Sequence, residues 1–257
     1  MPRAPRVELP YTELAPPPDL APYVDRFWAR TTLRADPARM HRVLPDGCVD
    51  VIVRVDRGRA VLVGTMTRAI TMPEAPAELI AVRFRPGAAG AVVRCALHEL
   101  TDRDVAVDEL GLAGDALVER IVDAPGLAGR IAVLAAWLRA RLAGAACPDP
   151  RISQAVRLLC GAARVEEVAR DVGVTRQHLA RAFRREVGIS PKALARIARM
   201  QRAAAALGRG RPLARLAVEL GYFDQAHLAN ELRALSGATP AVLAAEPPIA
   251  LSHLYAR

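Results

Sequence analysis

The first half of the chain alternates apolar and polar residues after an irregular, proline-rich stretch at 1–22. Every odd position from Val49 to Val55 is valine, whereas Asp50 and Arg54 occupy even positions. This period of two predicts a strand with one buried face. A turn signal and a second apolar run predict a hairpin partner, and a further alternating run follows. The strands predicted in this way are 49–55, 60–63 and 78–85.

Spacings of three and four residues replace the alternation after Gly87 and predict helices. One helical run ends at Leu100, and a longer apolar stripe extends over Ile131–Leu142. We expect this stripe to pack on its own domain, with a dimer contact as the alternative. The glycine and two prolines of Gly144–Pro150 predict a linker. The predicted domains are 1–146, an α+β domain with a small β-barrel or sandwich plus helices, and 147–257.

An internal duplication fills the last third of the chain. The segment from residue 165 aligns with the segment from residue 213, and the second copy gains one residue after its central glycine. Each copy has a small residue, a glycine four residues later, a polar residue, an apolar pair four residues apart, and a closing Gly-x-Ser/Thr-Pro. The matched pairs are Ala169 with Ala217, Gly173 with Gly221, Thr175 with Asp224, Leu179 with Leu228, Phe183 with Leu232, and Pro191 with Pro240.

These parts are the ones that a helix-turn-helix requires. A small residue lets two helices cross closely, and the glycine supplies the positive φ of a tight turn. Thr175 and Asp224 are suited to cap the helix that follows. The apolar pair then buries one stripe of that helix and leaves the opposite stripe exposed. The sequence predicts two such units, at about 165–187 and 213–235, in an all-α domain.

Residues 151–240 resemble the DNA-binding domain of the AraC/XylS family of bacterial transcription regulators. The most specific likeness is the segment Gly221-Tyr-Phe-Asp-Gln-Ala-His-Leu228 with Leu232 and the following Gly237-x-Thr-Pro240. The resemblance implies a sequence-specific regulator of double-stranded DNA, with RNA polymerase as a further partner if it activates. It also implies a connector helix, expected at Pro191–Leu207, that holds two recognition helices in successive major grooves, about 34 Å apart.

The first recognition helix is expected to read bases with Gln177 and Arg181. They lie four residues apart on one face, where the family's base-contacting positions fall, and Arg can bond guanine while Gln can bond adenine. A phosphate contact or a solvated charge is the alternative for Arg181, and a phosphate contact is preferred for Arg184. Arg176 lies on the same exposed part of the helix.

The second recognition helix is less basic, and its exposed candidates are Gln225, His227 and Asn230. Asn230 stands where many family members carry a basic residue, which leaves open whether this helix makes strong base contacts. His227 suits a phosphate as well as a base. Further phosphate contacts are expected from the connector. The connector candidates are Lys192, Arg196, Arg199 and Arg202.

The charge distribution agrees with a DNA-binding second half. The chain has a net charge of +9, but residues 1–150 hold 19 basic and 19 acidic residues. Residues 151–257 hold 17 basic and 8 acidic residues, so the whole excess lies there. A basic segment next to a neutral one favours a module for a polyanion joined to a module with another task.

The neutral half resembles, less specifically, the sensor domains of a poorly characterised branch of the same family, at 41–52 and 82–87. This resemblance implies an unknown small-molecule effector, and the domain is also expected to serve dimerisation in a possible homodimer. The candidates for the effector site are Trp28, His41, Asp50 and Arg83, because each is polar or amphipathic beside apolar strands. A separate structural role for each residue is the alternative.

Two other functions compete with an effector-controlled regulator. In the first, Cys48 would accept an alkyl group as in a DNA-repair fusion; however, the adjacent Asp46 and Asp50 would raise its pKa, and the four scattered cysteines lack a zinc-binding pattern. The second is an effector-independent DNA-binding protein. No hydrolase or nucleotide-binding motif occurs, so we expect no enzyme, cofactor or metal. With no signal core and no long apolar run, a cytoplasmic protein without membrane contact is expected.

Overall fold

The computed structural model describes residues 9–207 and 209–246. Its first half contains a six-stranded antiparallel sheet with the order β1-β2-β7-β4-β5-β8, and β3 pairs with β6 in a separate two-stranded ribbon. The strands are β1 (Leu9–Leu14), β2 (Val24–Thr32), β3 (Met40–Val43), β4 (Val49–Arg54), β5 (Arg59–Val63), β6 (Ile70–Pro73), β7 (Ala77–Phe84) and β8 (Asp104–Ala106). The three predicted strands are confirmed as β4, β5 and β7.

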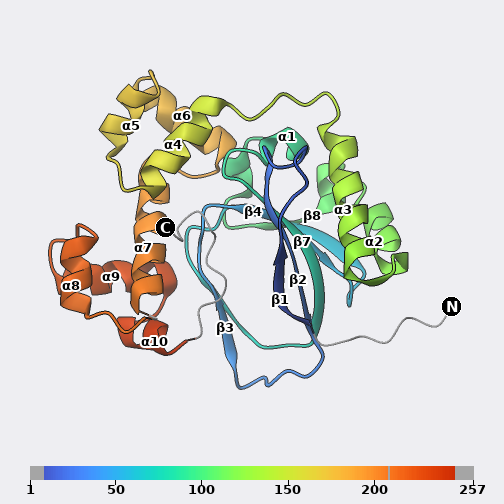
Figure 1. The fold of residues 1–257 in the computed structure, drawn as a ribbon, viewed down its shortest axis with the longest axis horizontal. Helices are drawn as coiled ribbons and strands as arrows, with labels where there is room; N and C mark the ends of the chain where they lie inside the picture. The colour runs from blue at the N-terminus through green and yellow to red at the C-terminus, as the bar shows by residue number, and fades with distance from the viewer. Residues whose placement is uncertain (1–8, 208, 247–257) are drawn as a thin grey trace.

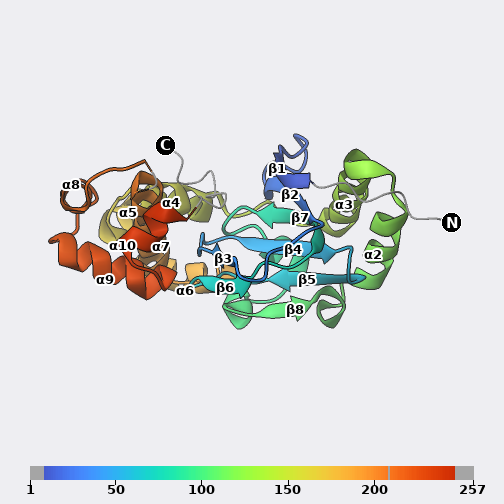
Figure 2. The ribbon, with the colours of Figure 1, turned by 90° about the horizontal axis from the view of Figure 1, so that it is seen from below.

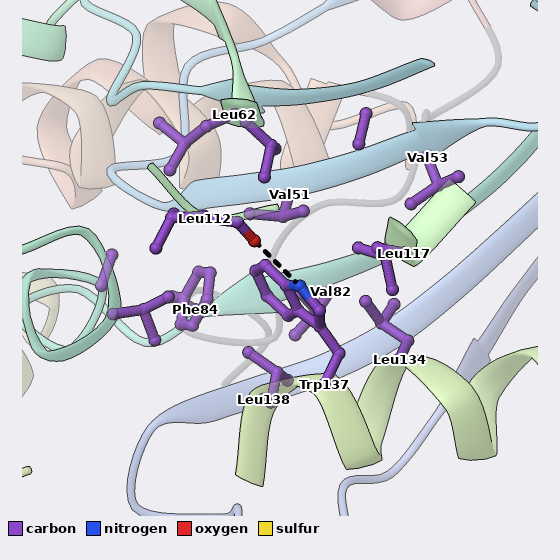
Figure 3. Close-up of a cluster of buried hydrophobic side chains, with 14 of the residues drawn as sticks. Val51, Val53, Leu62, Val82, Phe84, Leu112, Leu117, Leu134, Trp137 and Leu138 are labelled. Atoms are coloured by element: carbon purple, nitrogen blue, oxygen red, sulfur yellow. Dashed lines mark hydrogen bonds between the residues drawn. The ribbon is translucent and has the colours of Figure 1, made fainter. Parts of the chain in front are cut away.

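The two faces of the sheet differ in the way that the alternation predicts. Val51 lies opposite Val82 on β7 and Leu62 on β5, and all three are fully buried. Helices α2 (Gly114–Asp123) and α3 (Gly126–Leu142) cover this apolar face, and Figure 3 shows their side chains meeting those of the strands. The opposite face carries the even-numbered residues of β4.

Helix α3 packs on its own domain, as its apolar stripe predicts. Leu134 and Leu138 have no exposed surface, and the indole N–H of Trp137 donates to the carbonyl of Leu112 at 3.3 Å (Figure 3). The helix ends at Leu142, and the predicted linker follows it as an irregular segment up to Pro150 (Figure 1).

Two expectations for the first half are wrong. The stretch 1–22 is not irregular throughout, because β1 pairs with β2 at the edge of the sheet, where a proline is tolerated. The helical run after Gly87 is not one helix either. It forms α1 (Gly90–Val93) and the 3₁₀ turn η1 (Leu97–Leu100), because Arg94 takes a left-handed conformation with φ of 55° and ends the first turn.

The second half is entirely helical over its described residues and has two hydrophobic cores. One core lies among α4, α5, α6 and the first half of α7, and the other lies among the second half of α7, α8, α9 and α10. The helices are α4 (Pro150–Cys160), α5 (Val165–Asp171), α6 (Arg176–Glu186), α7 (Pro191–Leu207), α8 (Leu213–Glu219), α9 (Gln225–Ser236) and α10 (Pro240–Ala245). The predicted fold class, an α+β part followed by a double helix-turn-helix, is confirmed.

Figures 1 and 2 show the helices of the second half on one side of the sheet, with α2 and α3 on the other side. The ribbon β3–β6 faces the helical half, because Arg42 of β3 forms an ion pair with Glu246 after α10. A further 3₁₀ turn, η2 (Val107–Leu110), follows β8. Within residues 9–207 and 209–246, no helix is both long enough and apolar enough to cross a bilayer.

Candidate nucleic-acid interface

Both helix-turn-helix units are built around the glycine that the sequence predicts. Gly173 and Gly221 have φ of +70° and +71°. A Cβ placed on either glycine would contact nothing, so the backbone conformation and not a lack of space requires glycine there. The helices on each side are α5 and α6 in the first unit, and α8 and α9 in the second.

The two recognition helices begin with equivalent caps. The hydroxyl of Thr175 accepts the N–H of His178 at 3.1 Å, and the carboxylate of Asp224 accepts the N–H of His227 at 2.7 Å. Each bond satisfies one of the backbone donors that a helix leaves unpaired at its start. Both predicted caps are confirmed, so the amino end of each recognition helix is fixed by its own sequence.

The exposed face of α6 is strongly basic. Leu179 and Phe183 are buried, whereas the four predicted contact residues are exposed. The exposed residues are Arg176, Gln177, Arg181 and Arg184. Among them, Arg176 forms an ion pair with Glu166 of α5 at 3.2 Å. This surface presents guanidinium and amide donors side by side, which is the chemistry that reads guanine and adenine edges in the major groove.

The exposed face of α9 is nearly neutral and carries Gln225, His227 and Asn230. The ring of His227 is already engaged, because its Nδ1 accepts the N–H of Phe223 at 3.3 Å and it packs edge-on against Tyr222 at 5.3 Å. Sequence reasoning missed Phe223, which is 92% exposed immediately before the cap. The signal that could have identified it in the sequence is an apolar residue outside the buried stripe of the helix. An exposed aromatic ring at this end of a helix suits apolar contact with a thymine methyl group.

Two arginines of the connector α7 bind within the protein. Arg196 forms a two-pronged ion pair with Glu231 of α9 at 2.6 and 3.0 Å, which lowers the pKa of that carboxyl. Arg199 stacks over the ring of Tyr222 at 4.3 Å. These contacts tie α7 to the second unit and reduce the charge available to phosphates. Lys192 is exposed at the start of the connector.

Three of the four effector-site candidates meet on the face of the sheet opposite to α2 and α3. Asp50 of β4 pairs in register with Arg83 of β7, and its two carboxylate oxygens accept from the guanidinium at 3.0 Å each. Asp46 lies 3.2 Å from the same guanidinium. Trp28 is 7% exposed on the neighbouring strand β2. Burial raises the pKa of Asp50, and Arg83 opposes this shift.

The fourth candidate, His41, belongs to the ribbon and joins a different set of charges. Its Nε2 lies 3.2 Å from a guanidinium nitrogen of Arg30, which also pairs with Glu74 at 3.3 Å. Burial and the adjacent Arg30 lower the pKa of His41. Sequence reasoning missed Tyr11 of β1, whose ring packs against Trp28 at 5.6 Å, because that strand lay in the stretch expected to be irregular.

The environment of Cys48 disfavours a nucleophile. The side chain is 5% exposed, and its thiol donates to the carbonyl of Asp46 at 3.8 Å. Burial and the carboxylate of Asp46 raise its pKa well above the ordinary value, so the reactive thiolate is suppressed. In the described part of the chain, no cluster of three or more His, Cys, Asp or Glu side chains is arranged to hold a metal ion.

A recess of about 720 Å³ opens at the junction of the two halves. Residues of α1, the α3–α4 linker and the end of α6 line it, including Arg94, Cys147 and Arg185. None of its described lining residues belongs to the cluster around Arg83.

Comparison with known proteins gives matches to both halves. A family model described as a helix-turn-helix domain matches residues 168–246, and one described as a domain of unknown function matches residues 12–106. No curated protein matches the chain.

Three solved structures illustrate the structural matches. The C-terminal domain of AraT, a response regulator from Geobacillus stearothermophilus, is 24% identical over 40% of this chain and 89% of its own, with a TM-score of 0.36. ToxT from Vibrio cholerae is 8% identical over 84% of this chain and 93% of its own, with a TM-score of 0.39. ToxT with a bound unsaturated fatty acid is 10% identical over 84% and 90%, with a TM-score of 0.35. These scores are too low to establish a common fold over the full length.

The family model and the geometry agree on the second half. The matched residues include the end of α5, the complete recognition helices α6 and α9, and the connector between the two units. Both units show the turn glycine, the cap and the buried pair that the duplicated sequence predicts. The C-terminal part of this chain is therefore a double helix-turn-helix domain of the AraC type.

Proposed function

We propose that the protein is a sequence-specific transcription regulator that reads two successive major grooves with α6 and α9. The observation that carries this proposal is the pair of equivalently capped helices with exposed outer faces, joined by one continuous connector. The first helix supplies most of the charge, and the second supplies amide groups and the exposed Phe223 ring. Unequal contributions of the two half-sites to affinity follow from this difference.

Selection of bound sequences from random duplex DNA, with the full chain, tests this proposal. Two enriched half-sites should emerge, with centres separated by about one helical turn, roughly 10 base pairs. The half-site read by α6 should be the more strongly defined. Enrichment of no sequence, together with uniform weak binding to all DNA, would contradict sequence-specific reading.

We further infer that the first half binds a small-molecule effector at the cluster of Trp28, Asp50 and Arg83. Support comes from the chemistry of this face, where a nearly buried ion pair lies beside two aromatic rings, those of Tyr11 and Trp28. Buried ion pairs contribute little to stability, because desolvation offsets their attraction. A role in recognising a polar ligand accounts for an ion pair at this place on the sheet.

A single-tryptophan variant makes this inference measurable. The chain has two tryptophans, so Trp137→Phe leaves Trp28 as the only indole emitter. A compound that binds at the cluster should change this emission and should also change DNA affinity. By linkage, a compound that changes DNA affinity tenfold must bind the DNA-bound protein and the free protein with affinities that differ tenfold, about 1.4 kcal/mol. A compound that changes DNA affinity without affecting Trp28 would locate the effector elsewhere.

A further inference from the structure

One loop of the first half contacts both helix-turn-helix units. The loop at 64–69 connects β5 with β6, and the hydroxyl of Thr65 donates to the carbonyl of Val187 at 2.6 Å. Four residues later, the N–H of Ala69 donates to the carbonyl of Leu235 at 2.8 Å. Val187 directly follows α6, and Leu235 lies in the last turn of α9. We call residues 64–69 the bridging loop, since they hold the carboxyl ends of both recognition helices.

A second donor reinforces each contact at the equivalent place. The hydroxyl of Thr101 donates to the carbonyl of Gly188 at 2.8 Å, and a guanidinium nitrogen of Arg42 donates to the carbonyl of Ser236 at 2.8 Å. Gly188 lies just after α6 and Ser236 is the last residue of α9, so the carboxyl end of each recognition helix is bound by two donors. The last carbonyls of a helix lack partners within it and carry partial negative charge, which these donors satisfy.

The bridging loop is itself fixed within the first half. The N–H and the hydroxyl of Thr67 both donate to the carboxylate of Asp102 at 2.6 Å, and the N–H of Asp102 donates to the carbonyl of Thr65 at 3.1 Å. At Gly64 a Cβ would lie only 1.7 Å from the carbonyl oxygen of Leu100, so the loop passes in close contact with η1. The two contacts to the helices are therefore held by one rigid anchor.

Apart from the bridging loop, the two units are joined through the connector α7. They have separate hydrophobic cores and share only α7, whose first and second halves belong to different cores. Near the middle of α7, the side chain of Gln201 is 1% exposed and donates to the carbonyl of Pro45 at 2.6 Å. The connector is thus also attached to the first half.

The contact leaves the DNA-reading residues accessible. Gln177 and Arg181 in α6, and Gln225 and Asn230 in α9, are all exposed while the first half is docked. The bridging loop binds the opposite, carboxyl ends of these helices. Docking in this structure therefore positions the recognition helices without covering the faces proposed to read DNA.

We propose that Thr65 and Ala69 of the bridging loop, with Thr101 and Arg42, are positioning residues that set the distance and angle between the two recognition helices. The first half of the chain thereby helps to select the spacing of the two half-sites. This inference rests on the proposed DNA-reading function. It adds a determinant of specificity that makes no contact with DNA.

The test compares spacing preference in the wild-type chain and in the double variant Thr65→Val with Thr101→Val, which removes both hydroxyl donors and nearly preserves volume. Templates carry the two selected half-sites at the preferred spacing or with one base pair inserted or deleted, which rotates one site by roughly 34°. Thr12→Val is the matched control, because its hydroxyl donates only to Pro10 within β1. The single variant Thr65→Ser keeps a hydroxyl donor at this position and serves as the conservative control.

Wild type and Thr12→Val should lose affinity by about tenfold when the spacing changes, as for a mispositioned half-site. The double variant should lose only about threefold, because its helices can adjust, and the Thr65→Ser chain should behave as wild type. Equal spacing penalties in all four proteins would overturn the inference while leaving sequence reading intact. If wild type selected no half-sites, the proposed function itself would fail. If the double variant does not fold, Arg42→Gln replaces it, because this change removes the donor to the carbonyl of Ser236 in the second unit. Its loss of affinity on changed spacing should likewise be smaller than that of wild type.

Discussion

Asp224 closes the amino end of the second recognition helix through a single hydrogen bond to the N–H of His227. Asp224→Ala should lower the free energy of unfolding by about 1 kcal/mol, because the exposed backbone donor loses its protein partner. Asp224→Asn is the matched control and should stay within a few tenths of a kcal/mol, since asparagine caps as well as aspartate. Urea denaturation of the full chain measures both. Equal losses in the two variants would assign the effect to charge and not to capping.

Single residues were predictable where local backbone geometry decides their role. Gly173 and Gly221 have the positive φ of a tight turn, and Thr175 caps the start of a helix. A few neighbouring residues therefore suffice to identify them. The partners of Arg196 and Arg199 were not predictable. The sequence predicted phosphate contacts for both arginines, but the packing of α9 on α7 supplies Glu231 and Tyr222 as their partners. Their roles depend on which side chains the tertiary structure places nearby.

At the scale of elements, α3 joins the core of the first half through one apolar face. Leu134→Ala should destabilise the chain by about 2–5 kcal/mol, because a fully buried side chain leaves a cavity among the sheet residues. Ala132→Ser on the exposed face of the same helix should change stability by less than about 0.5 kcal/mol. Calorimetric or urea unfolding distinguishes the two. A small loss for Leu134→Ala combined with dissociation of a dimer would instead place this face in a subunit contact.

Elements with a strong period were predicted from the sequence, and elements defined by their neighbours were not. The valines of β4 alternate over the whole strand, and the connector α7 begins at the proline and ends at the leucine expected. By contrast, β1 contains a proline and forms a strand because it pairs with β2. The ribbon β3–β6 exposes most of its side chains, so it carried no hydrophobic alternation to reveal it.

At the scale of the whole molecule, residues 151–257 should fold and bind DNA without the first half. Their two hydrophobic cores draw almost entirely on their own helices, with Leu44 the contribution from outside. Binding should be weaker than in the full chain, because the carbonyls at the carboxyl ends of α6 and α9 lose the donors that align them. Circular dichroism and titration with the selected DNA measure both properties. An unfolded fragment would show that the second half needs the docked first half in order to fold, and not only to align its recognition helices.

The helical fold of the second half was predictable from the sequence, but its docking on the first half was not. The net positive charge is confined to the second half and the repeat identifies its fold, and both features are visible in the sequence. The contacts between the halves use backbone carbonyls of Val187, Gly188, Leu235 and Ser236 as acceptors. Every residue carries such a group, so no side-chain pattern signals the interface. Around Arg83, Trp28 and Asp50 were among the predicted candidates, whereas His41 lies in a different set of charges and the ion pairing was not predicted.

Base reading by α6 is tested by comparing the affinity of Arg181→Ala for the selected site with its affinity for random DNA. We expect a loss of about 1–3 kcal/mol on the selected site and almost none on random DNA, because a base contact distinguishes sequences and a phosphate contact does not. Arg120→Ala, an exposed arginine of α2, is the charge-matched control and should change neither affinity. Equal losses on both DNAs would contradict base reading by this helix.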